Sequence, residues 1–260
     1  MFFFKRKARK NISFPSQYTL DIINALGLRY EYFEPSSDDK KLLAAYKKAQ
    51  AKGVKEGFIP IILCVNSILA EWFTEIVDYG GKSLDEYRKD IISKAELIDG
   101  KAWLSDRIKE FKEVDDDEGY YAEIWNMSEL KGGEESHSFS AYKHYETGEV
   151  QDEILIVYVP ATIPYEVFAW LPFGGWNECP NPDKMIAVSR YWYEKCGAVP
   201  AVIKHDIIEY TARPLSEKDA IEVSQEHYAF CQDIVDQGYG GLSALADSLT
   251  KSTVWYFWWD

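Results

Sequence analysis

The sequence contains no long hydrophobic run, because no stretch approaches the roughly 18 apolar residues that a membrane-spanning helix needs. Its apolar start, residues 1–4, is far too short for the hydrophobic region of a secretory signal peptide. We therefore expect a cytoplasmic protein that makes no stable membrane insertion.

Cysteine, histidine and the common catalytic motifs are scarce. The four cysteines include no CxxC pair and no other metal-like spacing, which predicts reduced, mostly buried thiols. Four dispersed histidines are too few for a typical histidine-based metal hydrolase, and Walker, Rossmann, GxSxG and HExxH motifs are missing. The sequence therefore predicts no cofactor and no metal, and it argues against a common enzyme class. These residues are Cys64, Cys179, Cys196, Cys231, His137, His144, His205 and His227.

Positive charge is in deficit. The chain has 29 Lys and Arg against 43 Asp and Glu, a net charge of −14, and five of the cations lie in the first ten residues. Residues 11–260 therefore carry a net charge of −19. Such a body repels phosphate backbones, so we expect no nucleic acid partner except through the short basic arm; a basic protein partner, or none, fits the charge better. An acid-rich stretch, residues 110–135, is predicted to be a solvated loop or a docking surface for that partner.

The composition predicts a globular protein with an aromatic core, since 47% of residues are hydrophobic, 15% are aromatic and nine are Trp. We expect an α/β (or α+β) fold with one mixed sheet flanked by helices and no linker between domains. Residues 1–10 form a basic arm, and residues 11–260 form one unit with a helix-rich half, 11–150, and a second half, 151–260. Hydrophobic periodicity and capping residues predict helices over 16–26, 37–53, 66–80, 83–95, 103–111, 165–171, 183–195, 216–235 and 241–249. Strands are expected over 28–34, 58–65, 153–160 and 253–259, and residues 198–212 are expected to form a strand pair or one long bent strand.

The loop over residues 171–182 has two glycines, three prolines and two aromatic residues, so we expect it to be rigid. Trp176 and Asn177 are its candidate binding residues, and Cys179 is its candidate nucleophile. The alternative is a packed crossover in which Trp176 fills the core and Cys179 is inert.

The helix predicted over 216–235 places His227 and Cys231 four residues apart on one apolar face. Such a pair holds a metal or activates a thiol when the fold adds a third group, for which Cys179, His205 and Asp206 are the candidates. The alternative is a buried histidine beside a buried cysteine. Three acids of this helix, Glu222, Glu226 and Asp233, are predicted to share its opposite face.

The segment 255–259 is apolar on both faces of a predicted strand, which favours a central strand or an aromatic surface awaiting a ligand. Trp258 and Asp260 are therefore binding candidates. The carboxylates of Asp260 are placed at the end of this strand, where a cation is attracted.

Residues 154–260 resemble the bacterial family catalogued as domain of unknown function 4253. The resemblance is carried by Pro160-Ala161 with Pro164, by residues 171–180, by Tyr191-Trp192-Tyr193 with Gly197-Ala198, by Phe230-Cys231, Asp233-Ile234-Val235 and Gln237-Gly238, and by Leu245-Ala246 with residues 255–260. The family pattern has proline after the Phe-Cys pair, where this chain has Gln232. Because of this difference, the resemblance does not tell where the helix ends, or whether Asp233 and Asp236 project from a helix or from a loop. The family implies a fold and a bacterial cytoplasmic setting, and no activity.

Two functions follow from these features. The first is an acidic, aromatic-rich protein-binding module, similar to an immunity protein, that binds a basic partner through Trp176, Asn177, Asp236, Trp258 and Asp260. The alternative is a hydrolase, whose candidate residues are Cys231 or Cys179 with His227 or His205, or the carboxylates Glu226, Asp233 and Asp236 around a divalent ion. The sequence does not predict an oligomeric state.

Overall fold

The computed structural model describes residues 15–78, 83–113 and 119–260. The basic arm, residues 1–10, the predicted helix end at Gly80 and the acids Asp115 to Glu118 lie outside the described residues.

Six strands form one mixed sheet in the order β1-β3-β2-β4-β5-β6, which confirms the predicted α/β class. All neighbouring strands are antiparallel except β2 and β4, which run parallel through Ile62↔Val202 and Leu63↔Ile203. The strands are β1 (Arg29–Phe33), β2 (Ile59–Val65), β3 (Glu153–Val159), β4 (Val199–Ile203), β5 (Ile207–Thr211) and β6 (Val254–Trp258).

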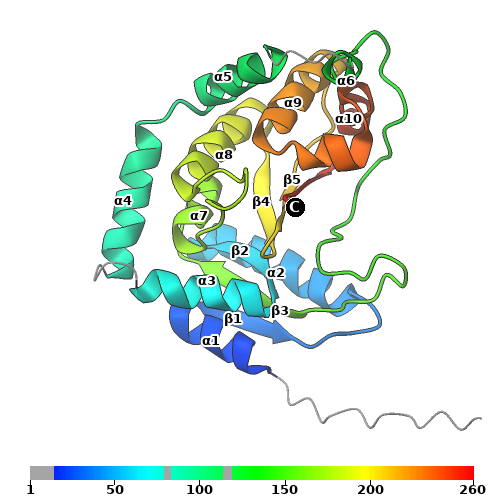
Figure 1. Cartoon of the computed structure of the whole chain (residues 1–260). Coiled ribbons are helices and arrows are strands. Elements are labelled where there is room, and N and C mark those ends of the chain that lie inside the picture. Colours follow the sequence, from blue (N-terminus) through cyan, green and yellow to red (C-terminus); the bar gives the residue numbers. More distant parts are fainter. Residues whose placement is uncertain (1–14, 79–82, 114–118) are drawn as a thin grey trace, which may run out of the picture.

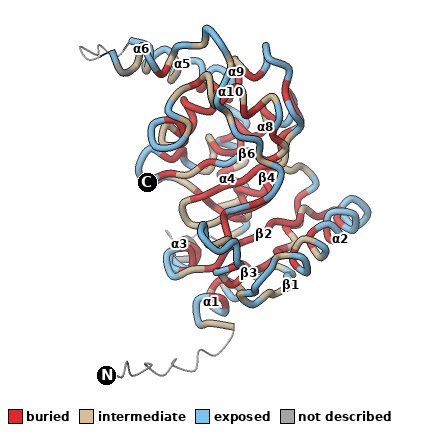
Figure 2. The backbone as a smooth tube through the Cα atoms, turned by 90° about the vertical axis from the view of Figure 1, so that its right-hand side faces the viewer, coloured by how far each residue is buried: buried red, intermediate tan, exposed pale blue. Residues whose placement is uncertain are grey.

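Helices cover the two faces of this sheet unequally (Figure 1). One face packs on most of the helices and includes Trp255 and Phe257, whereas the other packs on α2 and on residues 139–150. Figure 2 shows that the strands at the centre are buried along most of their length. The helices are α1 (Gln17–Leu26), α2 (Lys40–Glu56), α3 (Ser67–Asp78), α4 (Leu84–Glu96), α5 (Gly100–Lys112), α6 (Tyr120–Ile124), η2 (Pro164–Glu166), α7 (Val167–Trp170), α8 (Pro182–Cys196), α9 (Glu217–Phe230), η3 (Ile234–Tyr239) and α10 (Leu242–Leu249).

The predicted helix starts are confirmed where a capping side chain sets them. Ser16 accepts a hydrogen bond from the N–H of Thr19, and Ser83 forms a capping box with Glu86. The predicted stop at Gly53 is wrong, because α2 continues to Glu56 and ends at the cap residue Gly57, which has the left-handed φ of 74°. Gly53 instead lets the helix approach Phe58 closely, since a Cβ there would lie 2.3 Å from the carbonyl oxygen of Phe58.

The Trp-rich segment lies in the sheet, as predicted, but β6 is an edge strand and not a central one. Trp255, Phe257 and Trp259 are buried against the helices, while Tyr256 on the opposite face is 38% exposed. One edge of β6 therefore has no neighbouring strand within the described part of the chain, although one face of the strand is fully covered.

A long segment without helix or regular strand joins α6 to β3 and runs down one side of the molecule (Figure 1). It passes the start of β6, where the N–H of Val254 donates to the carbonyl of Ser136 over 3.0 Å. Residues of the acid-rich stretch are thereby brought beside β6. Among the described residues, no helix is both long enough and apolar enough to cross a membrane.

Candidate functional site

A pocket of about 600 Å³ lies beside the outer edge of β6. We call it the β6 pocket. Its walls come from three segments that are distant in the sequence: residues 132–136, the turn η3 with the residue before it, and β6 itself. Its lining residues are Gly132, Glu134, Glu135, Ser136, Asp233, Ile234, Gln237, Gly238, Tyr239, Tyr256 and Trp258.

The charge of this pocket is entirely negative. Its lining residues, all of them described, include the carboxylates of Glu134, Glu135 and Asp233 and no lysine or arginine. The rings of Tyr239, Tyr256 and Trp258 lie among these acids. Carboxylates together with aromatic faces form an environment that attracts a cation by charge and by cation–π contact.

The turn η3 owes its position to an early end of α9. The predicted helix to residue 235 is wrong, because α9 ends at Phe230 and Cys231 is extended, with φ −150° and ψ 100°. The thiol of Cys231 donates to the carbonyl of Trp258 over 2.9 Å, which ties the helix end to β6. The chain then forms a π-helical turn, a type of irregularity that is frequent at functional sites.

Asp233 and Asp236 therefore project from this turn and not from a continuous helix. Asp233 accepts hydrogen bonds from the amide of Gln237 at 3.1 Å and from the backbone N–H of Asp260 at 3.0 Å. Asp236 is exposed within the turn. Asn177 donates to the carbonyl of Asp260, so the loop 171–182, η3 and the residue after Trp259 are joined in one place.

Residues 132–136 are held against α10 by an uncommonly close backbone contact. A Cβ on Gly133 would lie 2.2 Å from the nitrogen of Ser248 and 2.3 Å from the carbonyl oxygen of Ala244, so only glycine fits there. The N–H of Gly133 donates to Asp247, and the hydroxyl of Ser248 donates to the carbonyl of Glu134. These contacts fix the wall that carries Glu134 and Glu135.

A second cavity, of about 250 Å³, adjoins the β6 pocket, and Ser136, Tyr239 and Tyr256 line both. Its other polar side chains are three serines, the imidazole of His227 and the indole of Trp255. His227 is 1% exposed, its Nε2 has no hydrogen-bond partner among the described residues, and burial lowers its pKa to about 3. We call this space the inner cavity; the histidine that lines it is neutral at physiological pH.

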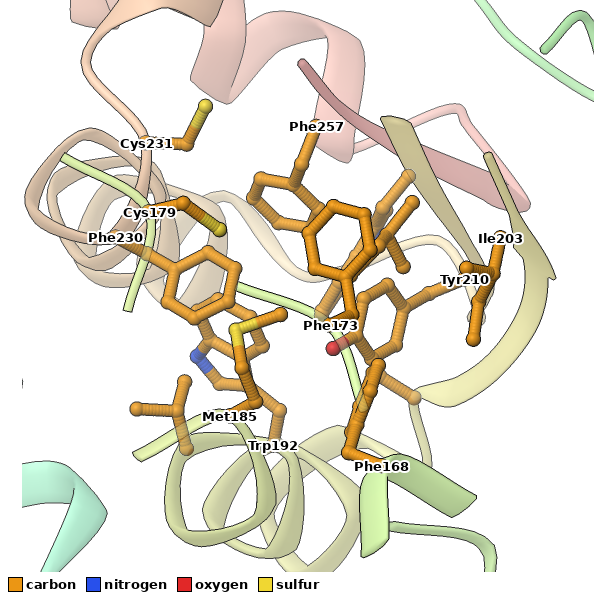
Figure 3. Packing of buried hydrophobic residues seen from close by; sticks show 14 of the residues in the cluster. Phe168, Phe173, Cys179, Met185, Trp192, Ile203, Tyr210, Phe230, Cys231 and Phe257 are labelled. Carbon is orange, nitrogen blue, oxygen red and sulfur yellow. The ribbon is translucent and has the colours of Figure 1, made fainter. Parts of the chain in front are cut away.

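The thiol and imidazole candidates are buried, as predicted, but their side chains have different surroundings. His227 packs against Trp192, Trp255 and Phe257, with ring centroids 4.5 to 5.0 Å apart. Cys231 instead lies with Cys179 at the margin of the aromatic cluster in Figure 3. Burial raises the pKa of both thiols well above the usual thiol range, so neither is poised as a thiolate nucleophile.

Glu226 is buried, which corrects its predicted place on an exposed face with Glu222. Its carboxylate accepts hydrogen bonds from Trp192 Nε1 at 2.9 Å, from the Tyr191 hydroxyl at 2.7 Å and from Lys195 Nζ at 2.8 Å. The charge of Lys195 and two neutral donors compensate its desolvation. Glu226 therefore joins α9 to α8 and takes no part in a metal site with Asp233.

His205 and Asp206 lie where the parallel strands β2 and β4 end. His205 Nδ1 is 2.6 Å from the side-chain nitrogen of Asn66 and 3.1 Å from Asp206 Oδ1. Lys204 pairs with Asp152 at 2.9 Å. Burial lowers the pKa of His205. These residues form a polar network that is separate from Cys231, and within the described chain no group of three or more His, Cys, Asp or Glu side chains is arranged to hold a metal ion.

Trp176 packs into the protein between Trp72 and Trp259, with centroid distances of 5.3 and 6.4 Å, and it is half-buried. Asn177 beside it is exposed and has a positive φ of 47°. Trp258, in contrast, lines the β6 pocket directly. The structure thus places Trp258 and Asp233 at the pocket, Asp260 and Asn177 next to Asp233, and Trp176 in the packed crossover.

The conformation of this loop depends on Gly174, which has a φ of 99° and lies so close to Pro180 that a Cβ would be 1.9 Å from its carbonyl oxygen. We expect Gly174→Ala to lower the free energy of unfolding by about 2 kcal/mol, from backbone strain and the clash together. Gly148→Ala is the matched control, because Gly148 also has a positive φ, of 69°, but nothing lies within 4 Å of its Cβ position. Urea unfolding of both variants tests this, and equal losses would contradict the role of the close contact.

Among the pocket residues to which we give a role, four were not predicted from the sequence as site residues: Glu134, Glu135, Tyr239 and Tyr256. The two glutamates belong to the acid-rich stretch, and the signal that could have singled them out is the pair Gly132-Gly133 directly before them. Tyr239 follows Gly238 in the π-helical turn, which no periodicity indicates.

Residues 155–260 match the family described as Domain of unknown function (DUF4253), in agreement with the resemblance found in the sequence. The match runs from within β3 to the end of β6 with the helices between them, and it includes η3, Tyr256 and Trp258 but not residues 132–136. No curated protein and no solved structure matches the chain.

Proposed function

We propose that this chain is a binding module for a basic protein partner, which it engages at the β6 pocket. The observation that carries the proposal is the composition of the pocket wall, where three carboxylates and three aromatic rings line a space of about 600 Å³ without a cation. Neutralisation of a basic toxin, as by an immunity protein, is one concrete form of this function.

The net charge of the chain supports the same partner. With a net charge of −14, the protein attracts a cationic molecule over a long range, and the carboxylates of the pocket then bind that molecule directly. The polar residues that we assign to binding are Asp233, Asp236, Asn177 and Asp260, with Trp258 as the aromatic anchor. Trp176 does not line the pocket, but its ring packs against Trp259, which lies between Trp258 and Asp260 in the chain.

The alternative, a hydrolase, has less support from the described residues. Raised thiol pKa values at Cys179 and Cys231 and the lowered pKa of His227 leave no activated nucleophile–base pair among these three candidates. If the hydrolase were correct, Cys231→Ser or Asp233→Asn would abolish turnover of a small substrate with little change in melting temperature.

The binding function is tested with a labelled cationic probe, the peptide acetyl-Val-Lys-Val-Lys-Val-Lys-amide, by fluorescence anisotropy. We expect the double variant Glu134→Gln, Glu135→Gln to bind this peptide about fivefold more weakly at low salt, because two exposed charge contacts are lost. We expect the affinity of the wild type for this peptide to fall as the salt concentration is raised from about 20 to about 150 mM. At the higher concentration, charges are screened beyond about 8 Å.

The matched control is Glu71→Gln, Glu75→Gln on α3, which removes the same charge from exposed positions outside the pocket. Its affinity should stay within about twofold of wild type. Equal weakening in both double variants would show that the peptide senses only net charge, and it would overturn the assignment of the site.

A further inference from the structure

On the outer edge of β6, one residue has both its N–H and its C=O without a hydrogen-bond partner among the described residues. Backbone groups alternate along the edge of an antiparallel strand, so every second residue points away from the neighbouring strand. The N–H of Val254 points outward, to Ser136, and the carbonyl of Trp258 points outward, to the thiol of Cys231. The N–H of Trp259 points inward, to the carbonyl of Asp206.

Tyr256 lies between these two tied positions and has the same outward direction. Across the described ranges 15–78, 83–113 and 119–260, no group is hydrogen-bonded to its outward N–H or C=O. The β6 pocket opens at this residue. An unpaired N–H and C=O at the mouth of a pocket are a template for one more strand.

We propose that the β6 pocket binds its ligand as an extended segment that adds to the sheet at Tyr256, with a lysine or arginine as the residue opposite Tyr256. This inference rests on the proposed function and specifies its ligand. The residue opposite Tyr256 exchanges two hydrogen bonds with it, from N–H to C=O in each direction. The available edge lies between the tied residues Val254 and Trp258, which are about 14 Å apart, so about three ligand residues fit between these two positions.

The charge of the opposite residue follows from the direction of side chains in paired strands. A residue directly opposite Tyr256 directs its side chain to the same face of the sheet as the tyrosine ring. Trp258 lies on the same face as Tyr256 because the two residues are two positions apart in the strand, and the pocket that both rings line also has Glu134 and Asp233 in its wall. A basic side chain there gains both cation–π and ion-pair contacts. The inner cavity, which has no charged lining residue, provides no such partner.

The pairing is tested with two methylated forms of the peptide acetyl-Val-Lys-Val-Lys-Val-Lys-amide. In the first, the backbone nitrogens of the lysines are methylated, which removes the N–H groups that would face Tyr256. In the second, the backbone nitrogens of the valines are methylated, which changes only N–H groups that point away from β6. Both forms keep the charge of the parent peptide and carry the same number of added methyl groups.

We expect the valine-methylated form to bind like the parent peptide and the lysine-methylated form to bind about tenfold more weakly. Methylation of the lysine nitrogen removes the N–H that would donate to the carbonyl of Tyr256, and the added methyl group points at β6 and keeps the lysine carbonyl away from the Tyr256 N–H. Hydrogen exchange at the amide of Tyr256 should slow when the parent peptide binds. If both methylated forms bind like the parent and the Tyr256 amide is unaffected, strand addition is overturned while charge recognition stands. If none of the three peptides binds the wild type at low salt, the proposed function fails as well.

Discussion

Replacing Glu226 by alanine is expected to lower the free energy of unfolding by about 3 to 5 kcal/mol, the usual cost of breaking a buried ion pair. The side chain of Glu226 is 4% exposed, and its removal leaves Lys195 without its closest carboxylate and the fully buried indole N–H of Trp192 without an acceptor. An orphaned buried donor adds its own desolvation cost. Chemical denaturation monitored by Trp fluorescence measures the change.

The control for this experiment is Glu222→Ala, because Glu222 pairs with the same Lys195 at 3.1 Å but is 47% exposed. An exposed pair contributes less than about 1 kcal/mol, so this variant should be close to wild type. A Glu226→Ala protein within about 1 kcal/mol of wild type would show that Trp192 and Lys195 find other partners.

The second large effect concerns Glu209 and pH. Glu209 is fully buried on β5; burial raises its pKa from 4.5 to about 7, although Ser140 donates two hydrogen bonds to it. Because its folded-state pKa is raised, the folded state binds the proton more tightly than the unfolded state does. Its contribution to stability is therefore complete below about pH 4.5 and is lost as the pH rises toward 7 and beyond, a loss of about 3 kcal/mol.

Glu209→Gln removes this loss, since an amide oxygen still accepts from Ser140 and carries no charge. We expect the variant to gain stability relative to wild type by about 2 to 3 kcal/mol between pH 5 and pH 8. Urea unfolding of both proteins at several pH values checks the sign as well as the size. A constant difference across this range would mean that Glu209 is ionised in the folded state at all of these pH values.

The sequence predicted the elements that depend on local interactions. Ser16, Ser83 and Gly197 set helix ends through contacts with residues three to five positions away, and such signals are visible in a linear sequence. The order of strands and helices, and the burial of His227 and Cys231, followed from hydrophobic periodicity in the same way.

What could not be predicted depends on partners far away in the chain. The end of α9 is set by a hydrogen bond from Cys231 to Trp258, 27 residues later, and the burial of Glu226 is set by α8, more than 30 residues earlier. The β6 pocket needs residues 132–136 beside a strand that begins more than 100 residues later. A pattern of period 2 in β6 indicated that its faces are apolar, but it carried no information on whether a neighbouring strand lies at each edge.

The strand order has a consequence for any shortened form of the protein. The matched family region begins at residue 155, within β3, and β3 lies between β1 and β2, both of which come from the first 65 residues. A fragment that starts at β3 would leave this strand with no partner on either side and would expose the parallel edge of β4, where β2 belongs. The region matched by the family is thus smaller than the unit that completes the sheet. During synthesis, about 90 residues are added after β2 before β3, the strand that pairs with both β1 and β2, is made.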